Sequence, residues 1–257
     1  MNRSEIIFPN GNRAILVTPP KGTSAVEILR VLDIPRPQAL ILVFGGASGL
    51  DETLTPLLLQ LCSRGIARLA ADMEALIMDG GTQSGVMAVI GQGVAERGRH
   101  SLLLGVAPAG KVTYPGGLPV TAGDDRVPLD PNHSHFVLVE SREWGDETTT
   151  LYSLAQSLAE GISAVTILVN GGPIAKEEVL ESVRHNWPIV VIEGTGRLAD
   201  EIARLTRTKG APIEDPVVAE IIAHGDIRLF PLKDPVDNLE RLLSQLLHAA
   251  SNPDLAR

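Results

Sequence analysis

Short apolar segments alternate with longer amphipathic segments over most of the chain. Strands are predicted for the apolar runs at residues 39–44, 75–78, 101–106, 136–140, 165–169, 189–192 and 227–229. Helices are predicted for residues 51–64, 84–97, 149–160, 176–185, 197–206 and 236–248. Strands that are apolar throughout are buried on both faces, and strands connected by helices form parallel sheets with right-handed crossovers. The pattern therefore predicts an α/β fold, a Rossmann-like, mainly parallel sheet with helices on both faces.

The first 35 residues follow a different pattern. Two short apolar segments, 5–8 and 14–17, flank the turn sequence Pro9-Asn10-Gly11 and predict a β-hairpin. A helix is predicted to follow as far as Leu32, with Thr23 or Ser24 as its N-cap. No linker separates this part from the rest, so we expect residues 1–257 to form a single domain with 1–35 packed against the sheet. Residues 251–257 are expected to be a frayed tail.

The composition narrows the classes of function. The formal net charge is -9, and no stacking aromatics are interleaved with basic residues, which argues against a nucleic acid polymer as partner. The single cysteine, Cys62, excludes an internal disulfide and a multi-cysteine metal site, and its apolar neighbours indicate a small buried side chain. The chain begins without the apolar segment of a signal peptide and has no apolar run of about 20 residues. We therefore expect a cytoplasmic location and no membrane insertion.

Glycines follow the predicted strands at four points along the chain. They belong to the segments Gly45-Gly46-Ala47, Gly80-Gly81-Thr82, Gly171-Gly172 and Gly194-Thr195-Gly196. Ligands of open α/β sheets bind beyond the carboxyl ends of the strands, where glycine allows the backbone to approach closely and a helix N-terminus offers free N–H groups to an anion. A single such segment is better explained as a tight turn. Four at equivalent strand ends predict a ligand cleft.

The segment from Gly80 to Met87 is the sharpest candidate for a phosphate site. Gly80 and Gly81 free the turn, and Thr82 and Ser84 carry hydroxyl donors. Gly85 lets the start of the helix lie against a phosphate, where the helix dipole would add about 0.3–1 kcal/mol. No lysine follows these glycines and the spacing is not G-x-G-x-x-G, so neither a P-loop nor a dinucleotide fingerprint is present.

A second candidate is the segment Glu193-Gly194-Thr195-Gly196-Arg197. Arg197 would lie in the first turn of a helix, where a cation opposes the helix dipole. An anionic ligand between the arginine and the glycine loop explains this placement, and so does an arginine turned to solvent. Glu193, at the end of a strand, is a candidate for binding ribose hydroxyls or else faces the edge of the sheet.

A third polar group ends the long irregular segment 107–131 and leads into the next strand. It contains Asp130, Asn132, His133 and His135. Two histidines two positions apart share one face of a strand, which suits a metal pair or general acid–base groups. Only Asp130 offers a further ligand nearby, so no metal site is predicted. We expect instead a structural, hydrogen-bonding role beside the ligand site.

Taken in order, these motifs resemble the SLOG (LSDAT) family, and in particular the N-terminal cytosolic domain of melastatin-type TRP channels in a stand-alone prokaryotic form. The resemblance is carried by VFGGA (43–47), GGTQSGVM (80–87), GVAP (105–108), LDPNHSHF (129–136), NGGP (170–173) and EGTGRLAD (193–200). It implies a Rossmann-like sensor of a nucleotide-derived ligand such as ADP-ribose, another NAD product or a cyclic relative. It also places residues 80–87, with Val86 and Met87, and residues 194–197 beside that ligand.

The wider SLOG class includes LOG-like phosphoribohydrolases, which cleave a base from a nucleoside monophosphate and carry a P-G-G-x-G-T-x-E-E signature. The corresponding stretch here, NGGPIAKEE (170–178), keeps the paired carboxylates but has Ile174 and Ala175 in place of the Gly-Thr. By this resemblance Glu177 and Glu178 would be catalytic. As acids in the first turn of a helix they are also explained by the helix dipole, which is the interpretation we favour.

These observations predict a binding module that senses a soluble nucleotide derivative and reports through an effector protein or by homo-oligomerisation. No cofactor beyond the ligand is expected. The alternative is a nucleotide N-glycosidase. The sequence departs from the channel pattern at 141–146, where an acidic-glycine turn is replaced, and at 151–154, where an arginine is missing. It therefore does not select one nucleotide among these ligands.

Overall fold

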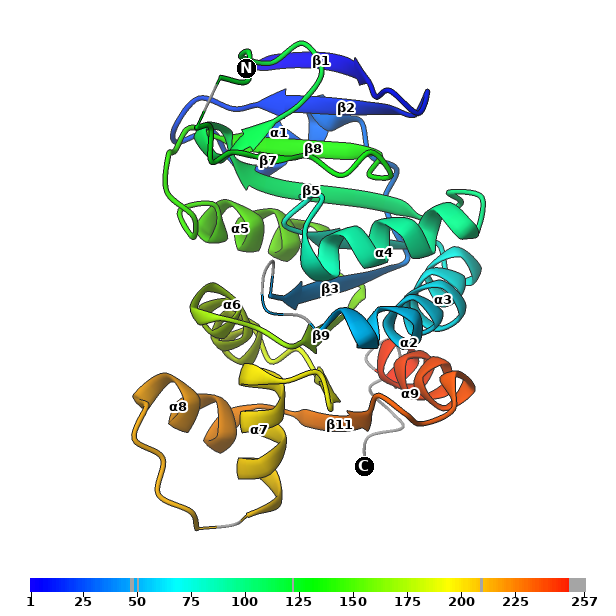
Figure 1. The fold of residues 1–257 in the computed structure, drawn as a ribbon, viewed down its shortest axis with the longest axis vertical. Coiled ribbons are helices and arrows are strands. Elements are labelled where there is room, and N and C mark those ends of the chain that lie inside the picture. Colours follow the sequence, from blue (N-terminus) through cyan, green and yellow to red (C-terminus); the bar gives the residue numbers. More distant parts are fainter. Residues whose placement is uncertain (47–48, 50, 122, 209, 250–257) are drawn as a thin grey trace.

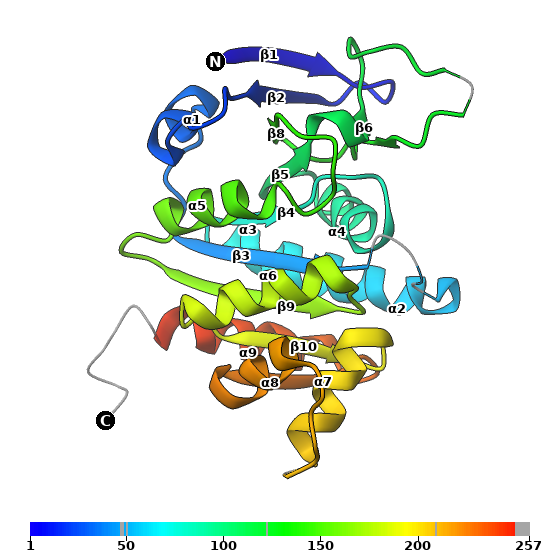
Figure 2. The same cartoon turned by 90° about the vertical axis from the view of Figure 1, so that its left-hand side faces the viewer.

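The computed structural model describes residues 1–46, 49, 51–121, 123–208 and 210–249. Within these residues the central sheet has nine strands in the order β1-β2-β8-β5-β4-β3-β9-β10-β11 (Figures 1 and 2). The bounds are β1 Asn2–Ile7, β2 Arg13–Thr18, β3 Ala39–Gly45, β4 Ala75–Asp79, β5 Leu102–Pro108, β8 His135–Val139, β9 Ser163–Val169, β10 Ile189–Glu193 and β11 Ile227–Pro231. β1 is antiparallel to β2, and every other neighbouring pair in this sheet is parallel. The predicted Rossmann-like, mainly parallel sheet is confirmed.

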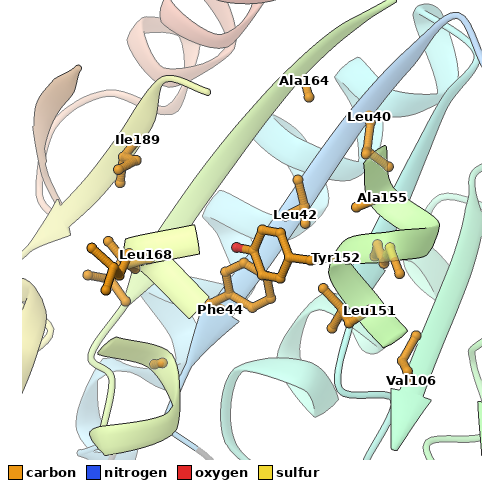
Figure 3. Packing of buried hydrophobic residues seen from close by; sticks show 14 of the residues in the cluster. Leu40, Leu42, Phe44, Val106, Leu151, Tyr152, Ala155, Ala164, Leu168 and Ile189 are labelled. Atoms are coloured by element: carbon orange, nitrogen blue, oxygen red, sulfur yellow. The ribbon is translucent and has the colours of Figure 1, made fainter. Parts of the chain in front are cut away.

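Helices cover both faces of this sheet, as predicted (Figure 1). One face carries α2 Thr55–Gln60, α3 Arg68–Asp72, α4 Gly85–Glu96 and α9 Val236–Ala249. The other carries α1 Ala25–Leu32, α5 Thr148–Leu158, α6 Pro173–Arg184, α7 Arg197–Arg207 and α8 Pro216–His224. Because successive residues of β3 point to opposite faces, Leu40, Leu42 and Phe44 pack beneath α5 and α6. Figure 3 shows Tyr152 of α5 over the ring of Phe44, with ring centroids 6.0 Å apart.

The predicted N-terminal hairpin is present, and it extends the sheet because β2 pairs in parallel with β8. Of the two residues predicted as N-cap of α1, Thr23 and Ser24, the structure shows Ser24. Its Oγ accepts a hydrogen bond from the Glu27 amide while the Glu27 carboxylate accepts one from the Ser24 amide, which is a capping box. A separate small core joins the hairpin to the outer strands through Phe8, Leu16 and Phe136.

The helical connection between β3 and β4 is longer than predicted. α2, the π-helical segment η2 (Leu61–Ala67) and α3 follow one another without a break and end at Asp72, so the predicted end at Arg64 is wrong. Gly65 does not terminate the helix. A Cβ there would lie 3.3 Å from side-chain atoms of both Leu239 and Val236, so this glycine admits α9 at close range. Cys62 in this segment is buried, and burial raises its pKa to about 12.

A helix and a pair of short strands were not predicted. α8 begins after Asp215, whose carboxylate accepts hydrogen bonds from the amides of Val217 and Val218, with Pro216 in the first helical turn. Within the segment 107–131, β6 (Val112–Thr113) pairs with β7 (Val127–Pro128), so this stretch is not wholly irregular. In the parts of the chain described above, no helix has the length and apolarity needed to cross a membrane.

Candidate functional site

A pocket lies at the carboxyl edge of the sheet, beside the end of β3. β4 lies on one side of β3 and β9 on the other, so the chain changes direction across the sheet at this point. Such a switch point is where open α/β sheets bind ligands. The pocket has a volume of about 330 Å³. This is near the lower end of the roughly 300–1,000 Å³ typical of small-molecule sites.

The end of β3 forms one part of the pocket wall, with Phe44, Gly45 and Gly46 lining it. A Cβ on Gly45 would lie 2.2 Å from the carbonyl oxygen of Val169 and 2.8 Å from Cγ1 of Val86. Only glycine therefore permits β9 and α4 to approach β3 this closely. Gly45 shapes the pocket by allowing this packing.

The turn between β4 and α4 forms a second wall, which includes Gly80, Thr82 and Ser84. Ser84 is the N-cap residue of α4, but its side chain makes no capping hydrogen bond. Part of the preceding turn is already occupied, because the amide of Gly81 donates to Oδ1 of Asp79 at 2.6 Å. An anion in the pocket would therefore meet the start of α4 rather than the amide of Gly81.

The opposite wall is formed by the start of α6 and by Arg197. Gly172 is the N-cap residue of α6 without a side-chain cap, and Pro173 occupies a first-turn position where its missing N–H costs nothing. The guanidinium of Arg197 lies against Gly172, since a Cβ there would be 2.9 Å from Nη2. Arg197 has a φ of 50°, which is uncommon for a residue other than glycine. A cation and two helix N-termini without side-chain caps thus border one pocket, an arrangement that attracts anions.

The glycine loop before α7 lies outside this pocket, and two of its amides are already hydrogen-bonded within the protein. The carboxylate of Asp200 accepts hydrogen bonds from the amide of Gly194 at 2.6 Å and from the amide of Gly196 at 3.1 Å. The loop thus holds an anion that belongs to the protein itself. Of the segment 193–197, only Arg197 lines the pocket.

The other polar residues of that loop also have partners within the protein. The hydroxyl of Thr195 is buried, donates to the carbonyl oxygen of Ile192 at 2.6 Å and accepts from the amide of Asn170 at 2.8 Å. Glu193 forms an ion pair with Arg207. These contacts tie the loop to β10, to α7 and to the residue after β9, and neither Glu193 nor Thr195 lines the pocket.

Two buried carboxyl groups, those of Glu147 and Glu178, also line the pocket. Burial raises the pKa of Glu178, and with the neighbouring carboxyls of Glu147 and Asp79 it brings that pKa to about 8. Burial likewise raises the pKa of Glu147, although its carboxylate accepts a hydrogen bond from the amide of Gly145 at 2.7 Å. The pocket therefore contains a carboxyl pair in which Glu178 is mostly protonated near neutral pH.

The expectation that Glu177 and Glu178 lie in the first turn of a helix is wrong. α6 begins at Pro173, so both residues lie in its second turn, beyond the reach of the terminal dipole. Glu177 is exposed and lies outside the pocket, whereas Glu178 is 8% exposed and lines it. The two neighbouring acids thus have different environments.

His133 is held between two carboxylates in a fully buried cluster behind the β4 turn. Its Nε2 lies 2.8 Å from Oδ1 of Asp79 and its Nδ1 lies 3.1 Å from Oδ2 of Asp130. Burial alone would lower the pKa of His133, but the two carboxylates outweigh it and raise the pKa to about 9. Asp130 also accepts from the amide of Asn132, and Asp79 from that of Gly81, so the cluster positions the turn that borders the pocket.

His135 shares none of these partners. Because β8 begins at His135, His133 precedes the strand, and the expectation that the two histidines share one strand face is wrong. Burial, with Arg3 nearby, lowers the pKa of His135 to about 4, and its Nδ1 contacts Oγ of Ser134 at 2.9 Å. Throughout the described residues, no group of three or more His, Cys, Asp or Glu side chains is arranged to hold a metal ion.

The structure brings only part of the predicted binding set to the pocket. The predicted residues that line it are Gly45, Gly46, Gly80, Thr82, Ser84, Met87, Gly172 and Arg197. Those at the same edge of the sheet that do not line it are Gly81, Gly85, Val86, Gly171, Glu193, Gly194, Thr195 and Gly196. Ala47 lies outside the described residues.

Other pocket residues were missed by the sequence analysis. They are Val43, Phe44, Val127, Trp144, Glu147, Pro173, Ile174 and Ala175. Trp144 and Glu147 follow β8, whose carboxyl end lies at the same edge of the sheet, and this position was the available signal. No glycine motif marks that strand end. Val127 belongs to β7, which pairs with β6, and nothing local to Val127 predicts its position.

The sequence matches a known family over most of its length. The profile of the family described as "SLOG in TRPM, prokaryote" matches residues 38–240, which contain every pocket residue named above.

Several curated proteins are similar to this chain over much of its length. Transient receptor potential cation channel subfamily M member 2 from Mus musculus is 30% identical over 207 residues, covering 68% of this chain and 14% of the channel. Subfamily M member 7 from Homo sapiens is 26% identical over 230 residues, covering 76% of this chain and 12% of the channel. A subfamily M member-like 2 protein from Nematostella vectensis is 29% identical over 210 residues. The similarity thus covers only a small part of the length of each relative.

Proposed function

Since the chain belongs to the SLOG family of TRPM-like proteins, we propose that its pocket binds a soluble nucleotide derivative and that the protein acts as a sensor of that ligand. The ligand class includes ADP-ribose, other NAD-derived nucleotides and cyclic nucleotides. The observation that supports this proposal is the convergence of Arg197 and the starts of α4 and α6 on one pocket. The site of action is the cytoplasm, with an effector protein or a second copy of the chain as the readout.

The pocket offers different surroundings to the parts of a nucleotide. A phosphate fits beside Arg197, where the guanidinium and the N–H groups at the starts of the two helices supply positive potential. Phe44 and Trp144 line the same pocket and provide aromatic surface for a base or a ribose. A nucleotide has both a phosphate for the anion-binding part of the pocket and a base for the apolar part.

Calorimetric titration with ADP-ribose, AMP and NAD tests the proposal. Arg197→Ala should weaken binding by about one to two decades, because a hydrogen bond to a charged group contributes about 1.5–3 kcal/mol. Arg204→Ala is the matched control, since Arg204 is exposed on the same helix and does not line the pocket. Equal affinities of Arg197→Ala and the unmodified protein would remove Arg197 from the site, and no binding of any of the three compounds would overturn the proposal.

A nucleotide N-glycosidase is the second candidate, and the position of Glu178 favours it. A carboxyl with a pKa of about 8 inside a ligand pocket retains its proton near neutral pH and suits a general acid. In that reaction the C1′–N bond of AMP breaks, the leaving adenine accepts the proton of Glu178, and water adds its oxygen to C1′ and returns a proton to Glu178. Chromatographic detection of free adenine from AMP tests it. Release should be lost in Glu178→Gln and kept in Glu177→Gln.

A further inference from the structure

The carboxyl pair of Glu147 and Glu178 has no ion-pair partner among the described residues. Both groups line the pocket. The carboxylate of Glu147 accepts from the amide of Gly145, whereas no described residue donates a hydrogen bond to the carboxyl of Glu178. Glu178 is thus a buried polar side chain whose hydrogen-bonding capacity is directed into the pocket.

Burying a carboxyl without partners is unfavourable, and a second carboxyl beside it increases the cost. The raised pKa of Glu178 reflects this environment of burial with Glu147 and Asp79. A ligand group that supplies N–H donors or a positive charge would satisfy the pair. A ligand group that brings another negative charge would be repelled by the pair in its ionised form, at short range in a desolvated site.

We propose that the Glu147–Glu178 side of the pocket holds the base of the bound nucleotide and selects bases with N–H donors or positive charge over bases that carry an anionic group. This inference rests on the proposed binding function, because it assumes that the pocket takes a nucleotide.

The arrangement of α6 sets the orientation of the ligand. Gly172, against which Arg197 lies, is the N-cap of α6, and Glu178 follows six residues later, which is about 9 Å along a helix axis. The phosphate end and the base end of one nucleotide unit thus have separate binding groups. Trp144 lines the same pocket and offers a flat surface for stacking of the base.

Nicotinamide mononucleotide and nicotinate mononucleotide are the probes that isolate this effect. They share the phosphate, the ribose and the pyridinium ring, and differ only in a carboxamide against a carboxylate on the ring. In calorimetric titrations at pH 9, where Glu178 with its pKa of about 8 is mostly ionised, we expect the nicotinamide compound to bind at least ten times more tightly than the nicotinate compound. Glu178→Gln and Glu147→Gln should each reduce this preference to below about threefold, mainly by strengthening binding of the nicotinate compound. The exposed Glu177→Gln should leave the preference unchanged.

The comparison in the unmodified protein is decisive by itself, whether or not the variants fold. Equal affinities for the two mononucleotides would overturn the inference, and so would a preference that survives in both pocket variants. ADP-ribose, titrated in the same series, separates this result from failure of the proposed function. Binding of ADP-ribose without binding of either mononucleotide would overturn the base selection alone, whereas no binding of all three would overturn both.

Discussion

The turn before α4 and the loop before α7 have similar sequences but different environments. Both follow parallel strands, both combine glycine with threonine, and both lead into a helix whose N-cap residue provides no side-chain cap. The start of α4 borders the pocket, whereas the loop before α7 is filled by the carboxylate of Asp200. A glycine-rich strand end is therefore available to an external anion only where the protein supplies no anion of its own.

Whether the amides before a helix are bonded by the protein's own side chain depends on one position in the first turns of that helix. Asp200 lies four residues after the N-cap Gly196 and turns back to the loop amides. The residue four positions after the N-cap is Ala88 in α4 and Lys176 in α6. Neither side chain can accept a hydrogen bond from an amide, so neither helix start is closed in this way.

The largest expected effect comes from placing an anion at the open helix. Ser84→Asp puts a carboxylate at the N-cap of α4, on the wall of the pocket. We expect the affinity for ADP-ribose to fall on the order of 100-fold, through repulsion of the phosphate and loss of the free N–H groups. The same change should raise stability by about 0.5–1 kcal/mol, because aspartate is a favourable N-cap.

Ser84→Ala is the matched control, since it removes the hydroxyl without adding charge and should change the affinity by less than about fivefold. Calorimetry and thermal unfolding measure the two effects on the same samples. An affinity in Ser84→Asp equal to that of Ser84→Ala would show that the start of α4 does not contact an anion.

The converse change frees the amides of the loop before α7 from their carboxylate partner. Asp200→Ala removes two charge-assisted hydrogen bonds, to the amides of Gly194 and Gly196. We expect it to reduce the free energy of unfolding by about 1–2 kcal/mol and to leave the affinity for ADP-ribose within about twofold. Denaturant unfolding and calorimetry provide the two measurements. A large loss of affinity at unchanged stability would place the loop before α7 in the ligand site.

The smallest expected effect concerns the carboxyl side of the pocket. The pKa of Glu178 is raised from 4.5 to about 8 by burial and by Glu147 and Asp79. Between these two values the folded protein binds more protons than the unfolded chain, so Glu178 lowers stability as the pH rises through this window. Glu178→Gln does not titrate and should gain stability relative to the unmodified protein from pH 5 to pH 8.5.

Thermal unfolding at a series of pH values measures this gain, for which we expect roughly 3–5 °C in Tm per pH unit, since the linkage slope is about 1.4 kcal/mol per unit. His133 also titrates in part of this range, but it is present in both proteins and its contribution cancels in the difference. Glu177→Gln is the control and should run parallel to the unmodified protein. Parallel curves for Glu178→Gln as well would contradict the raised pKa.

The sheet was predictable because its strands are buried on both faces and are therefore continuously apolar. The ends of β3, β4 and β9 were also predictable as pocket walls, because glycines mark them in the sequence. The end of helix 55–72 was not predictable from the sequence. Gly65 lies inside this helix because α9 packs closely against it, and α9 is far along the chain.

Two features of the site depended on tertiary structure. Glu147 and Trp144 carry no local signal, and they reach the pocket because β8 ends at the same edge as β4 and β9. The role of Asp200 was hidden because an acid in the first turns of a helix is explained by the dipole alone. A glycine motif predicts where amides are exposed, but the side chains of the next helical turn decide whether they stay free.

Amide chemical shifts test the central claim most directly, since each N–H group reports its own contact. A series of two-dimensional ¹H–¹⁵N spectra with increasing ADP-ribose should shift the amides at the starts of α4 and α6, from Ser84 to Met87 and at Ile174 and Ala175. The amides of Gly194 and Gly196, which are bonded to Asp200, should stay in place. Shifts of those two amides with an unchanged start of α4 would contradict the account.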